Sequence, residues 1–172
     1  IIGWNIPHDI FAIEGMVIPA IQSVANPWFT TYFSLIYIYG YIFLLVFPVL
    51  AYLALDDSEW LKTTAPTYGL NYAIGLVCYL MFIAYGPRNL LPDMVDPLLY
   101  SNWATSRFLT SAVNSNTNVF PSLHTSLSIS VALLAYRTRE AYSRWFPVAV
   151  VLSSSVIVST MYLGIHWATD VV

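Results

Sequence analysis

Charged side chains are scarce in this sequence. Lys, Arg, Asp and Glu together make up 9% of the 172 residues, whereas hydrophobic residues make up 58%. Soluble globular domains usually carry about 25% charged residues, so the composition excludes an ordinary water-soluble domain. The 13 Tyr and 6 Trp residues agree with this, because amphipathic aromatic side chains collect at membrane interfaces. We therefore expect a polytopic membrane protein.

Basic residues and cysteines are also few. Six Lys and Arg against nine Asp and Glu give a net charge of -3, which argues against nucleic acid as a partner. The single cysteine, Cys78, excludes a disulfide framework. The sequence has no basic segment typical of a signal peptide. It stops at Val172, in what we expect to be the opening turn of another helix, so we expect residues 1–172 to be one truncated membrane-embedded domain.

Long apolar runs predict an all-α fold, a polytopic transmembrane helical bundle with about five to six spans, since a helical span needs roughly 20 residues. The predicted spans are residues 29–55, 68–85, 121–136 and 146–163, with another one starting at residue 166. Residues 1–28 are expected to form an interfacial segment with a helix at 9–26, because polar residues such as Glu14 and Gln22 interrupt its apolar run. Glu14 and Gln22 would share one face of that helix, where contact with the active-site loop is possible. We expect Tyr32, Tyr37, Tyr39 and Tyr41 only to pack or to lie at interfaces.

The predicted loops alternate between two sides. The loops 56–67 and 137–144 share one side and contain most of the basic residues: Lys62, Arg137, Arg139 and Arg144. Cytoplasmic loops are enriched in Lys and Arg, so we expect this side to be cytoplasmic. Residues 86–120 then form a non-cytoplasmic loop over the active site, and three segments with unusual polar residues meet at that face.

The first two of these segments surround His166 and His124. His166 and Asp170 are four residues apart, which places them on one face of a helix, and a carboxylate that binds one imidazole nitrogen leaves the other free as a nucleophile. In the sequence Pro121-Ser122-Leu123-His124, a helix that starts at the proline presents free backbone N–H groups that can hold an anion. Ser122 adds a hydroxyl there, and His124 can serve as a general acid.

Two arginines belong to the third segment. Arg88 follows a Gly-Pro turn at the end of a predicted span, and its guanidinium can bind phosphate oxygens in a bidentate way. The alternative is an interfacial arginine that reaches the lipid headgroups, which is common. Arg107, in the same loop, has the same two interpretations without a surrounding motif.

These three segments, in this order, resemble the type-2 phosphatidic acid phosphatase superfamily, which includes lipid phosphatases, inositol phosphorylceramide synthase-like transferases and vanadium haloperoxidases. The family's second motif, Pro-Ser-x-His, is matched by residues 121–124. Its third motif, Ser-Arg-x5-His-x3-Asp, is matched by Ser159, His166 and Asp170 at the family's spacing. The resemblance covers residues 85 to 172 and is closest to the inositol phosphotransferase-like branch.

The resemblance implies a mechanism and a set of roles. His166 would attack phosphorus and form a phosphohistidine, Asp170 would orient it, and His124 would protonate the leaving oxygen. Arg88, Ser122 and Ser159 would bind the phosphoryl oxygens of a lipid phosphate substrate, and the chemistry requires no metal or cofactor. The sequence departs from the family at two cations, because Thr160 replaces the usual Arg and Met81 the usual Lys. These departures leave hydrolysis and transfer to a lipid or polyol hydroxyl both open.

Two alternative functions remain for the same residues. His124, His166 and Asp170 could form a proton relay in a transporter or channel, since ionisable groups at membrane depth are costly and functional by default. A relay predicts these groups near mid-membrane, whereas the alternation of loops places them near one surface. The missing cations also fit an inactive relative with a structural role.

Overall fold

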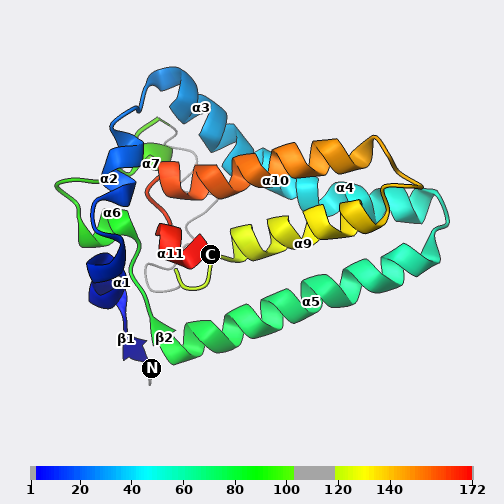
Figure 1. The fold of residues 1–172 in the computed structure, drawn as a ribbon, viewed down its shortest axis with the longest axis horizontal. Coiled ribbons are helices and arrows are strands. Elements are labelled where there is room, and N and C mark those ends of the chain that lie inside the picture. The colour runs from blue at the N-terminus through cyan, green and yellow to red at the C-terminus, as the bar shows by residue number, and fades with distance from the viewer. Residues whose placement is uncertain (1–2, 103–118, 172) are drawn as a thin grey trace.

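The computed structural model describes residues 3–102 and 119–171 (Figure 1). The described chain is mostly helical, as predicted, and its one sheet pairs β1 (Trp4–Asn5) with β2 (Phe82–Ile83) in parallel. Arg107 and the other residues of the predicted loop between 103 and 118 lie outside the described residues.

The N-terminal segment forms two short helices, α1 (Pro7–Glu14) and α2 (Val17–Gln22). The prediction of one continuous helix over residues 9–26 is therefore wrong. Gly15 separates the two helices with φ 60°, a conformation that glycine adopts at little cost. Its N–H donates to the Phe11 carbonyl (2.8 Å) and so ends α1. The break ends α1 at Glu14, whose carboxylate accepts hydrogen bonds from residues 168 and 169.

A continuous helix of 28 residues follows, from Pro27 to Ala54. It consists of α3 (Pro27–Leu35), the π-helical turn η1 (Ile36–Gly40) and α4 (Tyr41–Ala54). The Asn26 side chain caps its start by accepting the Phe29 N–H (3.0 Å). This helix agrees with the span predicted at residues 29–55.

The next helix, α5 (Ser58–Met81), includes most of the segment predicted as the loop 56–67. That prediction is wrong because the polar side chains are satisfied within the helix. Asp57 caps it through the Trp60 N–H (3.4 Å), and the hydroxyls of Thr64 and Thr67 each donate to a carbonyl four residues earlier (both 2.8 Å). The helix also ends before residue 85, since residues 82–83 pair with β1.

Two antiparallel helices complete the bundle, α9 (Leu123–Arg137) and α10 (Trp145–Tyr162), close to the predicted spans. The Ser153 hydroxyl on α10 donates to the Ser128 carbonyl on α9 (2.8 Å). Leu44 of α4 packs with residues of both helices in a buried cluster, whose other members are Val131, Ala135 and Ala149. Hydrophobic packing thus joins α4, α9 and α10 along the middle of the bundle.

The long helices place the connections at two opposite ends (Figure 1). The connection between α9 and α10 and the start of α5 lie at one end, where the Tyr142 hydroxyl donates to Asp57 Oδ2 (2.6 Å). The short helices α6 (Pro87–Leu90), α7 (Leu98–Asn102) and α11 (Ala168–Val171) lie at the other end, beside the start of α9. The predicted meeting of the three motif segments at one end agrees with this arrangement.

Two helices of the described chain are long and apolar enough to cross a membrane, Pro27–Ala54 and Trp145–Tyr162. The predicted number of five to six spans is not confirmed. Helix α9 has only 15 residues, and α11, where a further span was expected to start, is described over four residues. The first part of α5 is polar, which lowers the hydropathy of that helix.

We expect Gly86→Ala to destabilise the fold by about 1–3 kcal/mol, the usual cost of overpacking. A methyl group on buried Gly86 would collide with the carbonyl oxygen of Ile165, a backbone atom beside His166. Gly69→Ala in α5 is the control, since its methyl group would meet nothing within 4 Å and alanine favours a helix. Thermal unfolding in detergent measures both, and an unchanged melting temperature for Gly86→Ala would contradict the close approach.

The Tyr142–Asp57 hydrogen bond should make stability depend on pH in the alkaline range. It raises the pKa of the Tyr142 hydroxyl from 10.0 to about 12, because the carboxylate holds the proton on the phenol. The stabilisation is therefore complete below pH 10 and is lost as the pH rises through 12. Below pH 10, the free energy of unfolding of Tyr142→Phe should be about 1 kcal/mol lower than that of the wild type. Above pH 12, the two free energies should be equal. Denaturant titrations across pH 8–12 test this, with Tyr136→Phe as the control; a constant difference would contradict it.

Candidate active site

His166 and Asp170 lie in and after a tight turn that follows α10. Gly164 has φ 68° in this turn, and the Thr160 carbonyl accepts the N–H groups of both Ile165 (3.0 Å) and His166 (3.1 Å). His166 precedes α11, so the predicted contact with Asp170 arises from a turn and not from one continuous helix. The prediction that one continuous helix brings His166 and Asp170 together is wrong, although the two side chains do meet.

The two side chains of this pair are buried, each with 5% of its surface exposed. Nδ1 of His166 is 3.5 Å from Oδ2 of Asp170. That separation suits an ion pair but is long for a hydrogen bond. Asp170 Oδ2 also accepts the Trp167 N–H (3.0 Å), which holds the carboxylate on the Nδ1 side of the imidazole. Nε2 is therefore the nitrogen of His166 that faces away from Asp170.

Ser122 connects this pair to the start of α9. The helix begins at Leu123 rather than at Pro121, and the Ser122 hydroxyl caps it by accepting the Thr125 N–H (3.3 Å). The Ser122 N–H donates to the Asp170 carbonyl (3.2 Å), so a backbone hydrogen bond joins the second motif to the third. Ser122 is buried, with 1% of its surface exposed.

His124 faces His166 across the end of the bundle. Their ring centroids are 6.4 Å apart, and the two ring planes are inclined by 53°. Tyr37 stacks on the His124 imidazole (4.5 Å between centroids, 18° between planes), and Tyr41 lies against it at 4.2 Å and 36°. The sequence predicted that both tyrosines pack or lie at interfaces. Their contact with His124 was not visible in the sequence, because it depends on how η1 and α4 pack against α9.

Arg88 lies on α6, close to the turn before His166. Its backbone N–H donates to the Gly164 carbonyl (3.3 Å), and its Nη2 donates to the Tyr100 hydroxyl (3.4 Å). The guanidinium carbon is 4.8 Å from the centre of the Tyr100 ring. Nη1 is buried and has no hydrogen-bond partner among the described residues. Arg88 therefore has one donor nitrogen that residues 3–102 and 119–171 leave unused.

Three further motif positions carry no charged side chain that could bind phosphate. The Ser159 hydroxyl donates to the Val156 carbonyl (2.6 Å) and the Thr160 hydroxyl to the Ile157 carbonyl (2.7 Å), so both protons are used inside α10. Met81, at the end of α5, is exposed.

No group of three or more His, Cys, Asp or Glu side chains in the described ranges is arranged to hold a metal ion.

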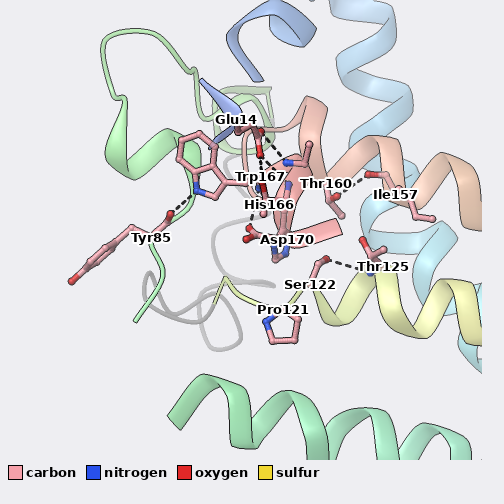
Figure 2. A network of polar contacts seen from close by, with 12 residues as sticks. Glu14, Tyr85, Pro121, Ser122, Thr125, Ile157, Thr160, His166, Trp167 and Asp170 are labelled. Carbon is pink, nitrogen blue, oxygen red and sulfur yellow. Dashed lines mark hydrogen bonds and ion pairs between the residues drawn. The ribbon is translucent and has the colours of Figure 1, made fainter. Parts of the chain in front are cut away.

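The N-terminal helices contribute polar contacts that sequence reasoning did not establish. The carboxylate of Glu14 accepts hydrogen bonds from the backbone of α11, as Figure 2 shows. The Gln22 amide donates to the Tyr162 and Asp96 carbonyls (2.9 and 3.0 Å) and accepts the Asp96 N–H (2.9 Å). The signal for both residues was a polar side chain inside an otherwise apolar segment.

Comparison with known families identifies the chain. No curated protein and no solved structure is detectably similar to it. The model of one family, described as the PAP2 superfamily, matches residues 11–172. This match includes both histidine motifs, the Arg88 segment and the helices that bring them together. The chain therefore belongs to the PAP2 superfamily, and this membership supports a phosphatase- or phosphotransferase-type function.

Proposed function

We propose that this protein is an integral membrane enzyme that removes or transfers the phosphoryl group of a lipid phosphate through a phosphohistidine on His166. Membership of the PAP2 superfamily supports a phosphatase or phosphotransferase. The observation that carries the proposal is the His124–His166 arrangement. Two imidazoles face each other at 6.4 Å, and Asp170 lies behind only one of them.

This asymmetry assigns a different role to each histidine. Asp170 beside Nδ1 keeps a proton on that nitrogen and leaves a lone pair on Nε2 of His166, which makes it the nucleophile. Among the described residues no carboxylate forms an ion pair with His124, which lies against the rings of Tyr37 and Tyr41. Aromatic faces attract a cation but bring no counter-charge to the imidazole, so the bound phosphate ester supplies the negative charge that keeps His124 protonated as a general acid.

The reaction then proceeds in two balanced steps. In the first step, Nε2 of His166 forms a bond to phosphorus, the bond from phosphorus to the leaving oxygen breaks, and His124 transfers its proton to that oxygen. In the second step, an acceptor O–H attacks phosphorus, the N–P bond breaks, and His124 takes the acceptor's proton. The histidines finish in their starting states, as a catalyst requires.

The phosphoryl oxygens need positive charge and donors nearby as negative charge develops on them. Arg88 supplies the guanidinium, and its unused Nη1 is the donor that we assign to this task. Ser122 and the first N–H groups of α9 lie beside His124 and supply neutral donors. Ser159 can join them only if its hydroxyl leaves the Val156 carbonyl. Within residues 3–102 and 119–171, the proposed site thus uses one arginine together with Ser122 and backbone groups.

Exposed apolar side chains support a membrane location and a lipid substrate. In the most apolar windows of Pro27–Ala54 and Trp145–Tyr162, only 28% and 33% of the residues are buried. A core helix of a soluble protein would be mostly buried. Large exposed side chains such as Phe43, Phe47 and Leu50 would lie against acyl chains. The basic residues of the α9–α10 connection favour a cytoplasmic location for that end, so we assign the site to the opposite face.

The acceptor is water in a phosphatase and a hydroxyl in a transferase. The sequences of residues 86–88, 120–124 and 159–166 together resemble the inositol phosphotransferase-like branch, and this resemblance favours the transferase. In that case a lipid or polyol hydroxyl enters the position of the attacking water. Both reactions share the phosphohistidine, so the same variants test both.

His166→Ala should abolish phosphate release from a panel of lipid phosphates in detergent, by about a thousandfold or more, since removal of a nucleophile has effects of this size. His124→Ala should also lower the rate. His8→Ala, which changes an exposed histidine on α1, is the control and should leave the rate unchanged. Radiolabelled substrate should leave an acid-labile phosphoryl group on the wild type and none on His166→Ala.

The other outcomes are equally informative. Equal release by the wild type and His166→Ala would refute the phosphohistidine. If the wild type releases no phosphate but transfers label between inositol lipids and an alcohol, the enzyme is a transferase. Absence of release, transfer and labelling in the wild type would reject the enzyme in favour of a proton relay or a structural protein.

A further inference from the structure

We infer that Glu14, on the N-terminal helix α1, is a positioning residue for His166 and Asp170. The inference rests on the proposed function of this pair, and it makes the N-terminal segment part of the catalytic unit. Nothing in the three motifs includes Glu14, which is more than 150 residues away from the pair in the sequence.

The contact uses both oxygens of the carboxylate. Oε1 of Glu14 accepts the Ala168 N–H (2.9 Å), and Oε2 accepts both the Thr169 N–H (2.9 Å) and the Thr169 hydroxyl (3.1 Å). Ala168 and Thr169 lie between His166 and Asp170 in the sequence. Glu14 therefore fixes the short piece of backbone that sets the distance between the two members of the pair (Figure 2).

Helix α11 needs such a partner. The described helix has four residues, and the first N–H groups of any helix have no acceptor within it. In an apolar environment an unsatisfied N–H is costly, and a carboxylate near a helix N-terminus is favourable in addition. Glu14 supplies both the acceptor and the negative charge from another part of the chain.

Helix α1 is itself held firmly enough to serve as this partner. The Ile6 N–H donates to the Ile83 carbonyl (3.1 Å) next to the β1–β2 pairing. Phe11 lies 6.1 Å from the ring of buried Trp167, and Ile10 belongs to the same buried cluster. Trp167 also donates from Nε1 to the Tyr85 carbonyl (2.9 Å). Glu14 thus joins the His166 segment to a rigid part of the fold.

Glu14→Gln is the sharpest test, because it keeps the size of the side chain and removes one acceptor. The amide oxygen can still accept one N–H, but the NH2 group then faces a second N–H donor. We expect kcat for phosphatidic acid in detergent micelles to fall by about 10- to 100-fold, as small displacements of catalytic groups do. KM should stay within about twofold. Glu14→Asp keeps two acceptors on a shorter side chain and should recover part of kcat.

Hydrogen exchange provides a readout that does not depend on turnover. In Glu14→Gln, the amides of residues 166–171 should exchange at least about tenfold faster, since local opening controls their exchange. The amides of α10 should keep their wild-type rates. Asp9→Asn is the matched control, because Asp9 is an exposed acid on the same helix and should change neither exchange nor kcat.

The results of the two measurements distinguish failure of the positioning role from failure of the proposed function. Wild-type exchange at residues 166–171 in Glu14→Gln, or an unchanged kcat in an active enzyme, would overturn the positioning role. Faster exchange throughout α10 would also overturn it, because Glu14 would then support the whole fold. Faster exchange confined to residues 166–171, in a wild type with no activity on any lipid phosphate, would support the anchor and reject the proposed function.

Discussion

The whole candidate site depends on the hydrogen bonds made by the Thr160 carbonyl at the end of α10. This oxygen accepts two successive N–H groups, from Ile165 and His166, and so folds the chain back immediately after the helix. Gly164 allows the fold-back with its positive φ. Without this turn, His166 would continue along the axis of α10 and away from α9. The side chain of Thr160 is incidental to the turn, which the backbone carbonyl maintains.

In the described residues, backbone hydrogen bonds join the three motif segments to one another. The N–H of Arg88 binds the Gly164 carbonyl, and the N–H of Ser122 binds the Asp170 carbonyl. The site geometry can therefore persist although the sequence has Thr160 and Met81 in place of two cations. The positions of the two histidines therefore do not require a cation at either of these two positions.

Sequence reasoning succeeded where the information was local. The apolar runs located α9 and α10 to within about two residues, the ordinary uncertainty of helix ends. It failed at residues 56–67, because threonine hydroxyls that bind their own helix look like loop residues in a one-dimensional pattern. It could not determine the contacts of Tyr37 or Glu14. Those contacts depend on packing between segments that are far apart in the chain.

The π-helical turn η1 has a consequence for how the long helix is read from sequence. Such a turn takes up an additional residue, and each residue of an α-helix rotates the chain by about 100°. The halves before Ile36 and after Gly40 are therefore out of phase, and no single helical wheel describes Pro27–Ala54. A relative without this turn would align only with a one-residue gap in the middle of an apolar helix.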